Sequence, residues 1–70
     1  MNEQYLIKLK QKLPKNGTSL IADKTNFSYA YVNMVLSGKK TNNEILFAAI
    51  SIASEFQQDL KAMANKIEAL

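Results

Sequence analysis

Apolar side chains recur every three or four residues at the start of the chain. From Glu3 to Leu13 they form one stripe, and the lysines of this segment lie largely off it; the stripe consists of Tyr5, Leu6, Leu9 and Leu13. Such spacing is typical of an amphipathic α-helix. Pro14 follows directly and disfavours helical geometry at the residue before it, so this helix is expected to end at Leu13.

A short second helix and a tight turn come next in the pattern. After a loop at residues 15–17, the segment from Thr18 to Thr25 is expected to be helical and to bury apolar side chains from Leu20, Ile21 or Ala22. Asn26 stands where this helix has to stop, and asparagine tolerates left-handed backbone better than any residue except glycine. We therefore expect the chain to reverse at Asn26.

A third helix is predicted from Tyr29 to Ser37. Ser28 can cap it by accepting a hydrogen bond from a backbone amide of the first turn, and Gly38 can close it. Its buried stripe is formed by Val32, Val35 and Leu36.

The last predicted helix starts near Asn42, because Thr41 and Glu44 have the spacing of a capping box. Its first apolar residues are Ile45, Leu46, Ala49 and Ile52. No proline or glycine follows Gly38, so the helix either runs unbroken to Leu70 or breaks near residues 55–59 into two. The fold is therefore predicted to be all-α, a compact bundle of four or five helices.

The end of the chain carries a second apolar stripe, which we call the tail stripe. Its residues follow at spacings of four, three, four and three, and are Phe56, Leu60, Met63, Ile67 and Leu70. Two helices bury such a seam against each other, which predicts a homodimer joined through this interface. The alternative is that the stripe folds back on the first helix within one chain. We accordingly divide the chain into a domain at residues 1–57 and a helical extension at residues 58–70, the tail.

Composition narrows the chemistry that the chain can perform. Its 70 residues include no cysteine and no histidine, so neither disulfides nor the usual metal ligands can hold the fold together. A domain of this size has a marginal core, which favours a partner subunit. We find no general base, nucleophile or metal cluster, and expect no enzyme, cofactor or metal. Short apolar runs and a charged start argue against a membrane span or a secretory leader, and we expect a cytoplasmic protein.

Charge is distributed unevenly along the chain. Residues 1–40 carry seven lysines and two acids, whereas residues 41–70 carry two lysines and four acids. The net charge of +3 therefore divides into +5 and −2. A lysine-rich surface is often simply solvated, but this asymmetry also suits a first part that binds a polyanion such as nucleic acid.

Residues 18–37 combine the side chains of a helix-turn-helix motif. Ala22 is small enough for two helices to cross closely, and Phe27, Val32 and Val35 can fix the second helix against the domain. Residues 18–57 resemble the phage repressor/Cro-like (XRE-type) family of bacterial and phage regulators, most specifically from Ser28 to Lys40. The resemblance implies a lambda-repressor-like DNA-binding domain, a bacterial or phage origin and a sequence-specific transcriptional repressor. Asn26 stands where the family usually has glycine, and the chain lacks arginine.

The face of the third helix opposite its buried stripe would enter the major groove of double-stranded DNA. This recognition face consists of Tyr29, Ala30, Asn33, Met34 and Ser37. Asn33 can make a paired bond to adenine, while Ala30 and Met34 can touch thymine methyl groups. Tyr29 and Ser37 can reach a base edge or a phosphate. Because arginine is the best partner for guanine, its absence predicts an A·T-leaning operator, which for a dimer would be palindromic.

Phosphate contacts are expected around the recognition face. Lysines would supply charge and salt dependence, and the family resemblance adds Tyr31 and the start of the second helix. The predicted phosphate-binding residues are Thr18, Ser19, Lys24, Ser28, Tyr31, Lys39 and Lys40. Two rival interpretations remain open: the tyrosines could lean on the core, and the lysine pair after the third helix could simply complement its dipole.

The alternative function is a non-enzymatic adaptor that uses a helix-turn-helix scaffold to bind protein. Its lysine-rich first helix would then dock on an acidic partner. DNA binding at low salt distinguishes this adaptor from the regulator.

Overall fold

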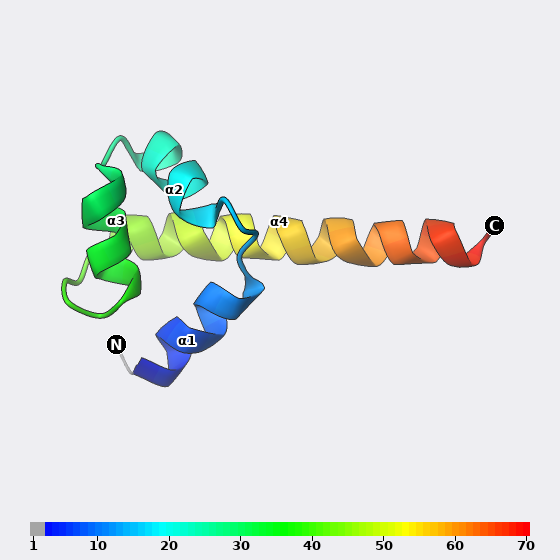
Figure 1. Ribbon diagram of the computed structural model, residues 1–70, viewed down its shortest axis with the longest axis horizontal. Coiled ribbons are helices and arrows are strands. Elements are labelled where there is room, and N and C mark those ends of the chain that lie inside the picture. The colour runs from blue at the N-terminus through cyan, green and yellow to red at the C-terminus, as the bar shows by residue number, and fades with distance from the viewer. Residues whose placement is uncertain (1–2) are drawn as a thin grey trace.

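The computed structural model describes residues 3–70, and these residues form four α-helices joined by short connections (Figure 1). The helices are α1 (Glu3–Lys12), α2 (Gly17–Thr25), α3 (Tyr29–Leu36) and α4 (Asn43–Glu68). All four predicted helices are present, and their ends lie at or within one residue of the predicted positions, except that α4 ends at Glu68, two residues before Leu70. The expectation of an all-α bundle is therefore confirmed.

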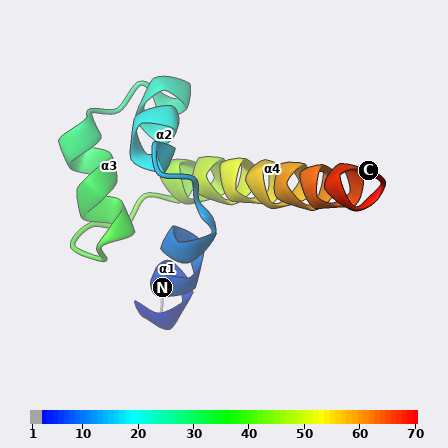
Figure 2. The same ribbon diagram turned by 45° about the vertical axis from the view of Figure 1, so that its right-hand side comes forward.

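The core lies where the first three helices meet the first half of α4. In both ribbon views α1 and α2 lie on opposite sides of α4, and α3 lies at its N-terminal end (Figures 1 and 2). The most completely buried large side chains come from three of these helices and are Ile21, Val32, Val35 and Ile45. Leu6 of α1 is buried, Leu9 and the following Leu13 are packed against the cluster, and Tyr5 is largely exposed. Burial of these apolar side chains is the main stabilising contribution available to a chain without disulfides.

The connection between α2 and α3 has the predicted geometry. Asn26 adopts the left-handed conformation with φ 64°, and its backbone N–H donates to the carbonyl oxygen of Ala22 at 2.9 Å. Ser28 then caps α3, because its hydroxyl oxygen accepts from the backbone N–H of Tyr31 at 3.1 Å. At the other end of α3, Gly38 takes φ 88°, a conformation that glycine adopts without steric cost. Local signals thus fix both ends of α3.

The predicted capping box at the start of α4 is wrong. The capping residue is Asn42 rather than Thr41, and its Oδ1 accepts from the backbone N–H of Ile45 at 3.1 Å. Threonine and asparagine are both good caps, so the local sequence does not decide between them. The nitrogen of the same side-chain amide, Nδ2, donates to the hydroxyl oxygen of Tyr31 at 3.4 Å. This contact between distant residues favours Asn42 as the cap.

The fourth helix settles the question of a break at residues 55–59. It runs without interruption for 26 residues and extends well beyond the packed part of the molecule (Figure 1). Every residue from Gln58 to Leu70 is exposed. The tail stripe therefore does not fold back on α1, and there is no fifth helix within residues 3–70.

Candidate nucleic-acid interface

The third helix lies at the end of the molecule farthest from the C-terminus (Figures 1 and 2). Its buried side consists of Val32, Val35 and Leu36, which fix the helix against the core. The opposite side is the recognition face, whose five residues are all exposed. The buried stripe therefore orients the predicted recognition face toward solvent.

The recognition face carries no charge and mixes apolar with polar groups. Tyr29 and Met34 are large apolar side chains that remain 57% and 41% exposed. Asn33 is exposed near the middle of the helix, with Ala30 one turn before it. Ser37 is the C-cap residue of α3, and its hydroxyl donates to the carbonyl oxygen of Met34 at 3.1 Å. An exposed amide beside apolar groups suits the edges of A·T pairs, which offer a donor, acceptors and a methyl group.

A hollow next to Asn33 brings basic residues close to the recognition face. It has a volume of about 290 Å³, and its polar lining comes from α1, the following loop, α2 and α3, as Lys10, Lys15, Thr18 and Asn33. Gly17 and Thr18 form the N-terminus of α2, where backbone N–H groups and the helix dipole favour an anion. The hollow thus places two lysines and a helix N-terminus beside the residue expected to read adenine.

Lys10 and Lys15 were not among the predicted site residues. Lys10 belongs to the polar side of an amphipathic helix, and Lys15 lies in a loop, so neither has a local pattern that distinguishes it from a solvated lysine. The excess of lysines in residues 1–40 is the only sequence signal that includes them. Their position beside Thr18 and Asn33 depends on how α1 packs against the rest of the domain.

Tyr31 and Ser28 are held by interactions within the domain. The Tyr31 ring is partly buried and packs on Phe27, with ring centroids 5.1 Å apart, while its hydroxyl oxygen accepts from Asn42. The Ser28 hydroxyl oxygen accepts from the Tyr31 amide as the helix cap. Tyr31 therefore packs on the core, as the rival interpretation of the tyrosines predicts. Its hydroxyl hydrogen is the group left to donate to a phosphate.

The remaining predicted phosphate-binding residues are distributed around this end of the molecule. Lys39 and Lys40 are exposed in the loop that follows α3, and Ser19 is exposed on α2. Lys24 lies at the end of α2, where its Nζ donates to the Ser51 hydroxyl at 3.4 Å. Lys24 therefore points toward α4, whereas the lysine pair is free to approach a nucleic-acid backbone.

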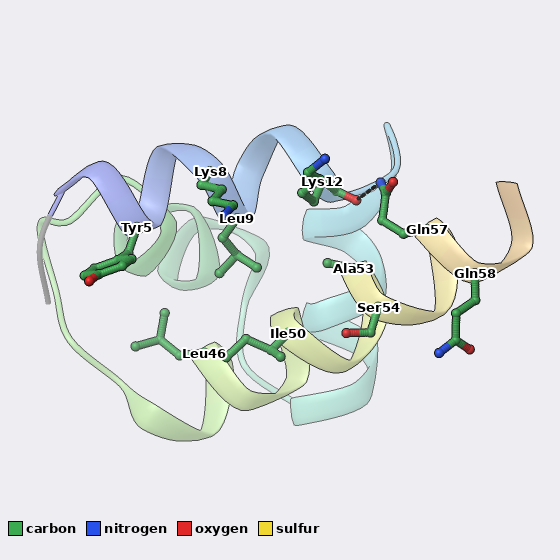
Figure 3. A pocket seen from close by; sticks show the side chains of 10 residues that line it. All are labelled: Tyr5, Lys8, Leu9, Lys12, Leu46, Ile50, Ala53, Ser54, Gln57 and Gln58. Carbon is green, nitrogen blue, oxygen red and sulfur yellow. Dashed lines mark hydrogen bonds between the residues drawn. The ribbon is translucent and has the colours of Figure 1, made fainter. Parts of the chain in front are cut away.

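A second concave surface lies between α1 and α4. This groove has a volume of about 620 Å³ and a largely apolar floor from Leu9, Leu46, Ile50 and Ala53, with two lysines on the α1 side (Figure 3). It narrows where Nε2 of Gln57 donates to the Lys12 carbonyl oxygen at 3.1 Å (Figure 3). The lysines at this groove are Lys8 and Lys12, on the side of α1 opposite to Lys10. The groove and the hollow are therefore separate features.

The tail stripe begins in the domain and ends in solvent. Phe56 is partly buried, whereas Leu60, Met63 and Ile67 are between 42% and 61% exposed.

Among residues 3–70 no helix is long and apolar enough to cross a membrane. In the same part of the chain, no three acidic, histidine or cysteine side chains gather where they could hold a metal ion.

Comparison with known proteins gives no match to a family model, to a curated protein or to a solved structure. What this chain binds therefore has to follow from the chemistry of its own surfaces.

Proposed function

We propose that this chain binds double-stranded DNA sequence-specifically through α3 and acts as a small transcriptional repressor of the helix-turn-helix type. The observation that carries the proposal is the hollow shared by Lys10, Lys15, Thr18 and Asn33. Base reading and phosphate binding need to occur side by side, because phosphate contacts fix the orientation in which side chains reach the bases. The hollow has an exposed asparagine amide and two lysines in its lining, which supports the proposal.

Asn33 is the principal base-reading residue in this proposal. Its exposed amide can donate to N7 and accept from N6 of one adenine in the major groove. Ala30 and Met34 lie on the same face of α3 and supply apolar contact for thymine methyl groups. The site is accordingly A·T-leaning, with Tyr29 and Ser37 at the borders of the contact.

Phosphates on either side of the major groove of the DNA bind to the basic residues around α3. One strand contacts the N-terminus of α2 with Lys10 and Lys15, which adds these two lysines to the predicted set. Lys39 and Lys40 contact the backbone from the loop after α3, and Tyr31 donates its hydroxyl hydrogen. These contacts supply affinity that falls with salt.

The proposal includes a homodimer joined through the tail stripe. A 70-residue chain without disulfides or a structural metal has a marginal core, which a partner subunit would stabilise. The exposed part of the tail stripe is the apolar surface available for this contact.

The experiment that tests DNA binding is selection of bound sequences from random duplexes, followed by fluorescence anisotropy on the selected and a scrambled duplex at several salt concentrations. We expect an A·T-rich site bound at least a hundredfold more tightly than the scrambled duplex. Absence of binding to any duplex at low salt contradicts the proposal and favours the protein-binding adaptor.

A further inference from the structure

The charged residues beside the tail stripe differ in sign along the helix. In heptad terms Phe56, Met63 and Leu70 occupy d positions, and Leu60 and Ile67 occupy a positions. Asp59 and Lys66 then occupy the two g positions at the edge of the stripe. Both are exposed, and neither has an opposite charge three or four residues away on its own helix. Each is therefore available to a charge on a second helix.

An antiparallel pair of tails brings these charges together. When a positions pack against d positions of a reversed helix, Phe56 lies opposite Ile67 of the second copy, and Leu60 lies opposite Met63. The g positions of two antiparallel helices flank the same edge of the seam, so Asp59 lies next to Lys66 of the second copy, and the reverse pair repeats by symmetry. Four apolar layers and two ion pairs form in a single register.

A parallel pair lacks this complementarity. In parallel helices g positions face e positions of the next heptad, so Asp59 would face Ala64. The other antiparallel register, shifted by one heptad, places Lys66 beside Lys66 of the second copy, and like charges at this distance are destabilising. Charge thus selects one orientation and one register.

This orientation determines where the two DNA-binding surfaces lie. In each copy α3 is at the N-terminal end of α4, and the paired segment is at the C-terminal end (Figure 1). Antiparallel pairing therefore places the two α3 helices at opposite ends of one rod. The N-terminal ends of the two α4 helices are on the order of 55 Å apart, from a rise of about 1.5 Å per residue. Half-sites in successive major grooves are only about 34 Å apart, so two adjacent half-sites of one duplex are too close together for this arrangement.

We propose that the chain forms an antiparallel dimer through its tail stripe, held in register by Asp59 and Lys66, and that this dimer links two separate DNA duplexes. The linking activity rests on the proposed function, because each end of the rod uses α3 to bind DNA. The pairing itself depends only on the tail stripe and on the charges of Asp59 and Lys66. A single palindromic operator with half-sites in successive major grooves would instead require the two α3 helices to lie closer together.

Cysteine cross-linking tests the orientation without DNA, since the natural chain has no cysteine. Under mild oxidation, a mixture of Phe56→Cys and Ile67→Cys chains is expected to give a disulfide-linked heterodimer, because the antiparallel register places these positions opposite each other. Ile67→Cys alone is expected to stay uncross-linked, since its two copies are on the order of 16 Å apart in this register. Efficient homodimer formation by Ile67→Cys alone would show parallel pairing and overturn the proposal.

Charge reversal tests the register by sedimentation. Asp59→Lys is expected to weaken dimerisation about tenfold or more, because two attractive pairs become repulsive, and Lys66→Asp is expected to do the same. The double variant Asp59→Lys/Lys66→Asp restores both pairs and should recover the original dimer. Independent, additive losses in the double variant contradict the pairing of these residues.

Capture of a second duplex tests the link between DNA molecules. A short A·T-rich duplex is immobilised, and retention of a fluorescent A·T-rich duplex is measured with and without the protein. We expect retention with the natural chain, its loss with Asp59→Lys and its recovery with the double variant. A chain that binds one duplex and cross-links as antiparallel, but retains no second duplex, overturns the linking activity. A chain that cross-links as antiparallel and binds no DNA contradicts the proposed function while supporting the pairing.

Discussion

At the residue scale, Asn33 combines an exposed position with a basic surrounding. Replacing it with alanine removes both hydrogen bonds to adenine and leaves the lysines of the hollow in place. We expect Asn33→Ala to weaken binding to the selected site by about 1 to 3 kcal/mol and to change binding to scrambled DNA little. Anisotropy on both duplexes measures the difference. An equal loss on both would show that Asn33 does not read bases.

Asn42 offers a second residue-scale prediction, because it caps α4 and also binds Tyr31. Asn42→Ala is expected to lower the free energy of unfolding by roughly 1 to 2 kcal/mol, since it leaves the amide of Ile45 without its cap. Thr41→Ala is the matched control and should change the free energy of unfolding by less than about 0.5 kcal/mol. Urea denaturation measures both. A larger effect for Thr41→Ala would restore the capping box predicted from the sequence.

At the scale of elements, the contact with phosphate depends on how α1, α2 and the loop after α3 are arranged around one helix. Replacing Lys39 and Lys40 with alanine should weaken binding to all duplexes alike and reduce the salt slope by roughly one per lost phosphate contact in each copy. If the hollow binds phosphate, the double variant Lys10→Gln/Lys15→Gln should likewise weaken binding to all duplexes and reduce the salt slope.

The control for both lysine pairs is Lys8→Gln/Lys12→Gln, which removes the same charge from the groove side of α1. Its salt slope should stay close to that of the natural chain, because these lysines do not line the hollow. Affinity measured as a function of salt concentration gives all the slopes. Equal slopes for the three double variants would mean that net charge, rather than position, governs binding.

At the scale of the whole molecule, the extended tail couples stability to association. A dimer that forms only from folded chains makes the unfolding temperature rise with protein concentration. Leu60→Asp/Ile67→Asp places charges within the seam and should abolish both this dependence and the dimer mass in sedimentation. Phe47→Asp is the control, because Phe47 is 70% exposed but lies outside the tail stripe. A natural chain that sediments as a monomer at tens of micromolar would exclude the tail as an interface.

Local sequence signals are enough to predict the helices and most of their ends. Pro14, Asn26 and Ser28 act on backbone groups within a few residues, so their effects can be predicted without knowing the fold. The same holds for the periodic apolar stripes, which specify the buried side of α3 and hence the exposed residues of the recognition face. These features depend on neighbours in the chain, and local physical chemistry describes them adequately.

Other features depend on contacts between residues far apart in the chain, and local sequence leaves them open. Asn42 caps α4 and also contacts Tyr31. Lys10 and Lys15 lie in one hollow with Asn33 because α1, α2 and α3 all pack against α4. Local sequence likewise does not decide whether the tail extends into solvent or folds back on the first helix, since both have the same apolar spacing. Its extension into solvent follows from continuous helix at residues 55–59, where no glycine or proline favours a break over the hydrogen bonds of the helix.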